Sequence, residues 1–125
     1  MRFAKGVRRK HIPGVMNKTE AEYALTLAAK KAAGEIQNYW FECFKIKLAD
    51  KTYYTPDFMV MANDDVWEAH EVKGFWEDDA RVKVKVFAET YPIRVRCFTK
   101  RAKKNGGGWE EETMTKGEER KDGAK

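Results

Sequence analysis

The residues of this sequence best suited to chemistry are two acids and a lysine, separated by one predicted turn. Asp57 comes directly after Pro56, and the run Glu71-Val72-Lys73 begins fourteen residues after Asp57. Successive side chains of a β-strand point to opposite faces, so Glu71 and Lys73 share one face and Val72 takes the other. The pattern therefore predicts a carboxylate and an ammonium group side by side.

The position of Asp57 depends on the turn that joins its strand to the strand of Glu71. If the turn is centred on Asp64, paired residue numbers sum to 128 and Asp57 lies directly opposite Glu71. Directly opposed side chains have Cβ atoms roughly 5 Å apart, and two carboxylates that close repel each other unless a cation lies between them. Mg²⁺, which takes carboxylate oxygens and waters, suits this spacing. A shift of one residue would separate the acids, and each acid alone also fits a solvated polar face.

Four strands are expected to position these residues. The segments are rich in aromatic and β-branched residues and are bounded by turn residues, as strands usually are. They cover residues 39–48, 52–61, 66–73 and 92–99, with turns at 49–51 and 62–65 and Gly74 closing the third strand.

A helix is predicted from Lys18 to about Gly34. Asn17 is a suitable N-cap, Glu20 three residues later completes a capping box, and Gly34 is a C-terminal stop. The expected apolar stripe consists of four residues, Ala21, Leu25, Ala28 and Ala32. Glu20 and Glu22 both flank this stripe, so helical geometry alone does not decide which acid faces the sheet.

The segment 78–90 has two interpretations. Residues 81–86 alternate strictly between basic and apolar side chains, which by period favours a strand. Asp78 or Asp79 is instead a natural N-cap for a helix, and the residues that follow tolerate one. Periodicity alone slightly favours the strand.

Charge is distributed unevenly along the chain, whose net charge is +5. Residues 1–15 contain five basic groups and no acid, and residues 99–125 contain eight basic and six acidic groups, whereas the middle is slightly acidic. Basic ends around a carboxylate site suit phosphate binding, although solubilising tails would have the same composition. We expect a basic arm over 1–15, one folded domain over 16–99 and a charged, disordered tail over 100–125.

The arrangement of motifs resembles the PD-(D/E)XK nuclease superfamily. A closer similarity, from about residue 16 to 100, is to the phage endonuclease I family of Holliday junction-resolving enzymes. The residues that support it are Thr55-Pro56-Asp57-Phe58 and Glu71-Val72-Lys73-Gly74-Phe75-Trp76-Glu77, followed by Asp79 and Arg81.

This resemblance implies an α/β fold with a restriction-endonuclease-like core. The element order would be helix, three-stranded meander, helix and strand around a mixed central sheet, so segment 78–90 becomes the second helix. The family also expects an acid on the first helix, and the run Asn17-Lys18-Thr19-Glu20-Ala21 resembles its helix start, which favours Glu20.

The activity implied by the resemblance is Mg²⁺-dependent hydrolysis of DNA phosphodiester bonds, with Mn²⁺ able to substitute. Asp57 and Glu71 would bind the ion, with the Val72 carbonyl and Glu20 as further ligands. Lys73 would orient or deprotonate the attacking water or stabilise the transition state. The catalytic set is thus Glu20, Asp57, Glu71 and Lys73.

The expected partner is DNA, with branched or junction DNA as the preferred class. Basic side chains outside the site are candidate phosphate contacts; they are Arg2, Lys5, Arg8, Arg9, Lys10, Lys83, Lys85, Arg94, Arg96, Lys100, Arg101, Lys103 and Lys104. The known junction enzymes are intertwined dimers with a long bridge between their first two strands. Here residues 48–51 suggest a tight turn, so strand exchange is not expected, although cutting two strands still favours a homodimer.

Two other functions remain open at this point. The chain could be a non-catalytic nucleic-acid-binding protein with a nuclease-like fold, or a less selective DNA nuclease of the same superfamily. No segment reaches the roughly 20 apolar residues of a membrane span, and no secretory signal is visible. We therefore expect a cytoplasmic protein, in the host cytoplasm if it is phage-encoded. Two cysteines and two histidines argue against a zinc site.

Overall fold

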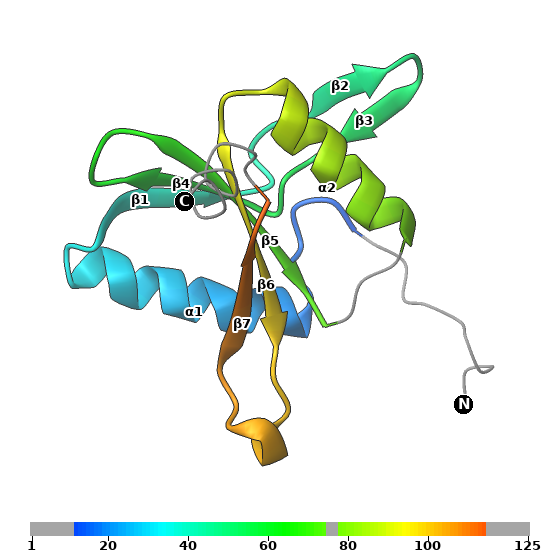
Figure 1. The fold of residues 1–125 in the computed structure, drawn as a ribbon. Coiled ribbons are helices and arrows are strands. Elements are labelled where there is room, and N and C mark those ends of the chain that lie inside the picture. The colour runs from blue at the N-terminus through cyan, green and yellow to red at the C-terminus, as the bar shows by residue number, and fades with distance from the viewer. Residues whose placement is uncertain (1–11, 75–77, 115–125) are drawn as a thin grey trace, which may run out of the picture.

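The computed structural model describes residues 12–74 and 78–114 of the chain (Figure 1). Two α-helices, seven strands and a short 3₁₀ helix make up this part of the chain. They are α1 (Lys18–Ala32), β1 (Ile36–Phe41), β2 (Ile46–Ala49), β3 (Thr52–Tyr54), β4 (Phe58–Ala62), β5 (Trp67–Lys73), α2 (Asp78–Thr90), β6 (Arg94–Lys100), η1 (Lys103–Asn105) and β7 (Trp109–Thr113).

Five strands form one mixed sheet in the order β1-β4-β5-β6-β7. The β1–β4, β4–β5 and β6–β7 pairs are antiparallel, whereas β5 and β6 are parallel. A parallel neighbour requires a crossover connection, and α2 is the helix in that crossover. The predicted α/β class and mixed sheet are therefore confirmed.

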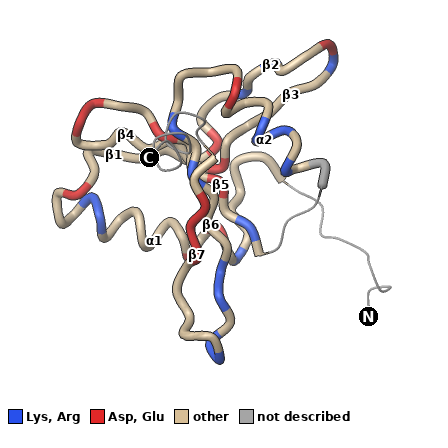
Figure 2. Tube along the Cα trace, in the orientation of Figure 1, with Lys and Arg blue, Asp and Glu red and all other residues tan. Residues whose placement is uncertain are grey.

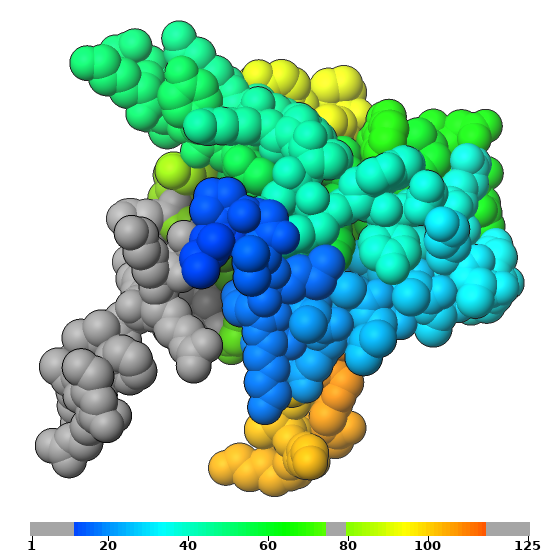
Figure 3. Space-filling model, turned by 180° about the vertical axis from the view of Figure 1, so that it is seen from behind, coloured from blue at the N-terminus to red at the C-terminus, as the bar shows by residue number. Residues whose placement is uncertain are grey.

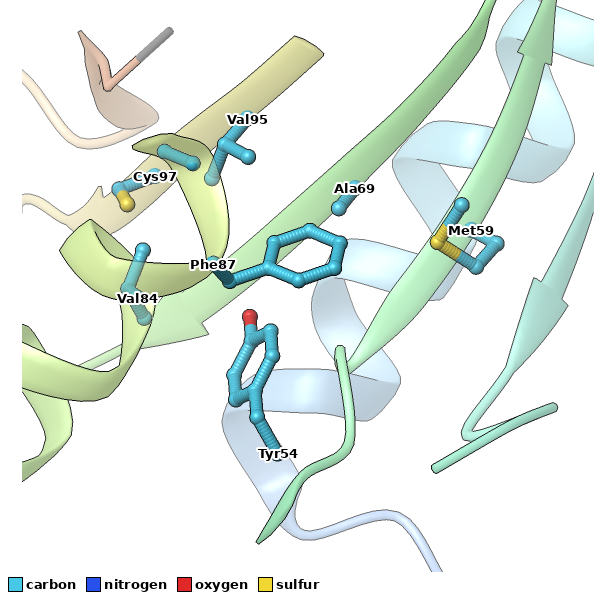
Figure 4. Close-up of a cluster of buried hydrophobic side chains, with 8 residues drawn as sticks. Tyr54, Met59, Ala69, Val84, Phe87, Val95 and Cys97 are labelled. Atoms are coloured by element: carbon cyan, nitrogen blue, oxygen red, sulfur yellow. The ribbon is translucent and has the colours of Figure 1, made fainter. Parts of the chain in front are cut away.

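The two helices cover opposite faces of the sheet, because alternate strand residues contact different helices. On one face, Tyr23 and Leu27 of α1 pack on strand residues that include Phe58 and Val72. On the other face, Phe87 of α2 packs in a second cluster. Figure 4 shows seven of its members: Tyr54, Met59, Ala69, Val84, Phe87, Val95 and Cys97. Asp57 and Glu71 each lie two residues from a member of this second cluster, Met59 and Ala69.

Helix α1 begins as predicted but buries a different face. The Asn17 side chain accepts from the Glu20 amide at 2.8 Å, and Glu20 Oε1 accepts from the Asn17 amide at 2.9 Å. The predicted apolar stripe is wrong: Ala21, Ala28 and Ala32 are exposed, and Leu25 is 72% exposed. The buried face consists of Glu20, Tyr23 and Leu27, since a tyrosine and a leucine bury far more apolar area than three alanines.

The predicted strands 39–48 and 52–61 are each broken in two, which corrects the simple three-stranded meander. β1 ends where Glu42 takes a φ of 47°, and β4 begins only after Pro56, which has no N–H for a ladder. The intervening β2 and β3 pair with each other in a separate hairpin, with the tight turn expected at residues 49–51. β1 and β4 pair with each other within the chain.

Segment 78–90 is a helix, so the resemblance predicted it correctly and the alternating period did not. Val84, Phe87 and Ala88 are buried at helical spacing, whereas Val82 and Val86 are exposed. The alternation arose because valines occupy both the buried and the exposed sides of the helix.

The expectation of a disordered tail from residue 100 onward is wrong for residues 100–114. Lys100 to Trp109 form a hairpin with η1 at its tip, and β7 pairs with β6 from Lys100–Trp109 to Arg96–Thr113. Trp109 packs edge-on against Tyr23 with ring centroids 5.2 Å apart, and Met114 packs on the α2-side core. The two large apolar residues of this segment therefore anchor an extra strand. The rest of the expected tail, and most of the N-terminal arm, lie outside the described residues. None of the helices described is both long and apolar enough to cross a membrane.

Candidate active site

Asp57 and Glu71 lie opposite each other at one end of the β4–β5 pair. The register runs from Met61–Trp67 to Phe58–His70, so paired numbers sum to 128, as the turn at Asp64 predicted. The next position brings Asp57 to Glu71, where the Asp57 amide lies 3.4 Å from Glu71 Oε1. The Val72 amide donates to Asp57 Oδ2 at 2.9 Å, which fixes the Asp57 carboxylate against β5.

Lys73 shares the face of Glu71, as strand alternation requires. Its Nζ lies 3.2 Å from Glu71 Oε2, and 29% of the lysine side chain is exposed. Burial lowers the pKa of Lys73, but the nearby carboxylates of Glu71, Asp57 and Glu20 outweigh it and raise the pKa overall. The ammonium group is therefore held in its charged form beside the acids.

The two central carboxyl groups are buried, with Asp57 6% and Glu71 4% exposed. Burial, with the charge of Glu71 next in size, raises the pKa of Asp57 well above its usual range. Burial also raises the pKa of Glu71, although Lys73 and the Tyr54 hydroxyl partly oppose this. Lys73 alone does not compensate the crowded acids, so a cation between them would lower the free energy of the ionised centre.

The first helix contributes Glu20 and not Glu22 to this centre. Glu20 is 5% exposed, and one of its oxygens belongs to a group of carboxylate oxygens within 4.8 Å of one another that includes Asp57. Glu22 points elsewhere and pairs with Lys100 at the base of the β6–β7 hairpin. The structure thus separates the two candidates that the helical wheel left equivalent.

Two residues at the centre were not predicted. Glu42, at the end of β1, is the third member of the group formed with Glu20 and Asp57. Tyr54, at the end of β3, donates its hydroxyl to Glu71 Oε1 at 2.5 Å. Neither had a recognisable sequence signal, because each reaches the centre only through the strand breaks at residues 42–45 and 55–57.

The carboxylate oxygens at this centre fit a hard divalent cation. Glu20 Oε2 and Asp57 Oδ1 are buried oxygens, and no described residue donates a hydrogen bond to either. Carboxylate oxygens are the ligands that Mg²⁺ prefers, and buried oxygens without donors are costly unless something binds them. The Val72 amide contacts the centre through its hydrogen bond to Asp57. That the Val72 carbonyl is a metal ligand remains a prediction.

The predicted DNA contacts fall on two surfaces of the described chain. Lys83 and Lys85 are exposed on α2, and Lys100, Arg101, Lys103 and Lys104 are exposed on the β6–β7 hairpin. Figure 2 colours basic positions blue along both elements. Arg94 and Arg96 on β6 both pair with Glu68. Arg2, Lys5, Arg8, Arg9 and Lys10 lie outside the described residues. In the parallel β5–β6 register Lys73 pairs with Thr99, so the hairpin leaves the sheet at the same end as the centre.

A second buried polar network lies on the α1 face and is distinct from the carboxylate centre. The Tyr23 hydroxyl and His70 Nδ1 are 2.6 Å apart, and His70 Nε2 lies 2.9 Å from Glu68 Oε1. Glu68 also pairs with Arg94 at 3.0 Å and Arg96 at 3.3 Å. This network ties α1 to β5 and so holds Glu20 and Glu71 in fixed relative positions.

The fold and the site define an α/β protein with a buried carboxylate–lysine centre at one end of a mixed sheet. A family model described as a protein of unknown function, DUF1064, matches residues 5–106, and the chain belongs to that family. No curated protein and no solved structure matches the chain.

Proposed function

We propose that the protein is a Mg²⁺-dependent endodeoxyribonuclease of the PD-(D/E)XK superfamily, with a restriction-endonuclease-like core. The observation that supports this best is the opposition of Asp57 and Glu71 across β4 and β5, with Lys73 3.2 Å from Glu71. Sequence similarity to the phage endonuclease I family suggested the same three residues. The placement of Glu20 at the centre adds the acid that this similarity expected on the first helix.

In this proposal Asp57 and Glu71 hold the ion, with Glu20 and the Val72 carbonyl as further ligands. Bound Mg²⁺, or Mn²⁺ in its place, would lower the pKa of a coordinated water and stabilise charge on the scissile phosphate. Tyr54 holds Glu71 in position through its hydroxyl, and the Val72 amide does the same for Asp57. The side chain of Lys73 then presents N–H donors to the attacking water or to the phosphate oxygens.

The substrate is proposed to be DNA, because the hairpin that carries several basic groups leaves the sheet at the same end as the acidic centre. The β6–β7 hairpin projects from the body of the molecule, as Figure 3 shows from behind, and Lys103 and Lys104 lie at its tip. Contacts of this kind bind the phosphate backbone without reading bases. The choice of branched or junction DNA, and a homodimer that cuts two strands, follow from the sequence similarity and belong to the same proposal.

Cleavage of a matched set of DNA substrates tests this function. Linear, nicked, forked and four-way junction DNA would be incubated with wild-type protein and with Asp57→Asn, in Mg²⁺ and in EDTA. We expect Mg²⁺-dependent cutting by the wild type, fastest on the junction, and none by the variant. Equal rates on all substrates would indicate a less selective nuclease. Tight DNA binding without any cutting would favour the non-catalytic alternative and reject the nuclease.

A further inference from the structure

Strand β1 is a free edge of the main sheet. Within residues 12–74 and 78–114, its hydrogen-bonded neighbour is β4 alone, and β7 forms the opposite edge. The two edges differ in charge, because β1 has no charged residue whereas β7 carries Glu110, Glu111 and Glu112. Charged side chains commonly prevent an exposed edge from pairing with another strand. β1 therefore lacks the protection that β7 has.

The backbone of β1 presents hydrogen-bonding groups on its free side. The Glu42 amide donates to the Asp57 carbonyl at 2.9 Å, so the even-numbered residues of this strand point their amides and carbonyls toward β4. The alternate residues, Tyr39 and Phe41, point theirs toward the free edge. The Tyr39 amide confirms this direction, because it donates to the Asn38 side-chain oxygen at 2.8 Å and not to β4. That oxygen lies where the carbonyl of a further strand would be.

The surfaces on both sides of this edge suit a partner. On the α1 side, a groove of about 570 Å³ separates β1 from the last turns of the helix, whose exposed residues there include Ala28 and Ala32. On the other side, Trp40 is 39% exposed and its ring centroid lies 5.4 Å from that of Trp67. Figure 3, the view from behind, shows the cyan atoms of β1 at the surface beside α1. Exposed tryptophan next to an unpaired strand is typical of an interface.

We propose that two copies of the chain pair through antiparallel β1 strands around a two-fold axis at Trp40. A two-fold interface uses the same patch on both copies, so the patch must be complementary to itself. This register meets that condition, because Tyr39 of each copy lies opposite Phe41 of the other and their free amides and carbonyls exchange hydrogen bonds. Trp40 then lies opposite its own copy, in the type of pair that brings side chains closest together.

Charge also favours a second copy over an unrelated strand. In this register Glu42 lies opposite the partner's Asn38. The Asn38 side chain accepts from Lys31 Nζ at 3.0 Å, so the partner's Lys31 comes near Glu42. Opposite charges therefore meet at both ends of the paired strands, and no like charges lie between them.

The consequence for activity rests on the proposed function. At about 4.8 Å between strands and 3.3 Å per residue, the two Asp57 residues of the dimer would lie about 20 Å apart. Two centres held at a fixed separation by one continuous sheet could cut two strands of the same DNA molecule.

Analytical ultracentrifugation of the full chain over a range of concentrations tests the interface. The wild type should form a dimer, and Trp40→Lys should raise the dissociation constant by about tenfold or more, because it places two like charges directly opposite each other. Trp67→Lys is the matched control. It changes the other member of the same tryptophan pair, which is 40% exposed but lies on the internal strand β5, and it should dimerise like the wild type.

A distance measurement on the wild type makes the test independent of these variants. Cys43 is exposed and Cys97 is buried, so a thiol-reactive spin label should attach to Cys43 alone. Cys43 is three residues from the proposed axis, so pulsed paramagnetic resonance should give a separation of about 20–30 Å between the two labels. A monomer at every concentration, a dimer without this separation, or equal dissociation constants for the two lysine variants would overturn the interface. Cleavage of junction DNA by a monomer would reject the interface alone. A dimer with this separation that cuts no DNA would reject the nuclease and leave the interface standing.

Discussion

The Tyr54 hydroxyl donates to Glu71 Oε1 at 2.5 Å, while the Tyr54 ring packs on Phe87 with centroids 5.1 Å apart. One side chain therefore joins the α2-side core to the carboxylate centre. Burial raises the pKa of Glu71, and the donated hydrogen bond is one of the contacts that oppose this rise. Tyr54 thus helps to keep Glu71 ionised, as the proposed cation site requires.

Tyr54→Phe should weaken Mg²⁺ binding more at pH 6 than at pH 8. Without the hydroxyl the pKa of Glu71 rises further, so a larger fraction of the carboxyl is protonated at the lower pH. A hydrogen bond to a charged group contributes about 1.5–3 kcal/mol, which corresponds to a loss of affinity of about tenfold or more at pH 6. Calorimetric titration at both pH values measures it. Tyr53→Phe, at the exposed neighbouring position, is the control. Equal Mg²⁺ affinities in the two variants would show that the Tyr54 hydroxyl does not support cation binding.

Asp57→Asn should stabilise the metal-free protein at neutral pH. The pKa of Asp57 is raised in the folded state by burial and by Glu71, so its stabilising contribution is present at acidic pH. That contribution is lost as the pH rises through the pKa of Asp57 in the folded protein, because the buried carboxyl then ionises. Asparagine cannot ionise, so the variant does not lose this stability. We expect a gain of about 1 kcal/mol or more at pH 7.5 in EDTA, since one unit of pKa shift corresponds to about 1.4 kcal/mol.

The same variant should gain nothing from the metal. Mg²⁺ should raise the melting temperature of the wild type and leave that of Asp57→Asn unchanged, because binding stabilises only the state that holds the ligand. Urea unfolding of both proteins from pH 5 to 8, with and without Mg²⁺, measures both effects. A variant less stable than the wild type in EDTA at pH 7.5 would show that Asp57 is not under electrostatic strain.

Lys73→Met should abolish cleavage and retain metal binding. Methionine keeps the length of the side chain but has no N–H donor for the water or the phosphate, and losing such a group costs about 10²–10⁴-fold in rate. Mn²⁺ affinity should be unchanged or higher, because removing the Lys73 charge removes a competitor for the carboxylates. Single-turnover cleavage and calorimetry would be run together, with Lys47→Met on β2 as the control. A cleavage rate within threefold of the wild type would exclude a chemical role for Lys73.

The centre of the site could be predicted because it depends on short-range geometry. The turn at Asp64 fixes one register, and the period of two in β5 then sets Asp57, Glu71 and Lys73. The helix start was equally local, since the capping box involves only Asn17 and Glu20. The helix at residues 78–90 was predicted only through the family resemblance, which outweighed the alternating pattern of residues 81–86.

Glu42 and Tyr54 could not be predicted because their positions depend on irregularities that accumulate. One bulge shifts the β2–β3 register between Ala49–Thr52 and Lys47–Tyr53, and another shifts the β1–β4 register between Ile36–Ala62 and Asn38–Met61. A one-residue error anywhere in that series reverses the face of Glu42. The strand β7 was missed for a different reason, because the run of acids from Glu110 to Glu112 resembles a tail until Arg96 and Arg81 are seen to pair with it.

The stability of the wild type relative to His70→Gln should shrink as the pH falls through about 6.5, the usual histidine pKa. Burial lowers the pKa of His70 in the folded protein, although Glu68 opposes this. As the pH falls through the usual histidine range, the histidine is therefore protonated in the unfolded chain before it is protonated in the folded protein. Stability from His70 is therefore present above that range and lost below it. Urea unfolding of both proteins between pH 5 and 8 measures the difference. An advantage that grows on acidification would mean that Glu68 dominates and that His70 is charged in the folded state.

The double substitution Lys103→Gln and Lys104→Gln should weaken DNA binding and reduce its dependence on salt. Both lysines are exposed at the tip of the β6–β7 hairpin, where Gly106, Gly107 and Gly108 all have positive φ and shape the turn. The substitutions touch no core residue, so the melting temperature should stay within about 2 °C of the wild type. Removing one lysine that binds a phosphate should reduce the slope of log affinity against log salt by about 0.9 for duplex DNA. The expected change is about 1.8 if both lysines bind phosphate.

Lys45→Gln with Lys47→Gln, on the separate β2–β3 hairpin, removes the same charge and should leave the slope unchanged. If both double variants lower the slope equally, net charge and not the β6–β7 hairpin determines the affinity for DNA.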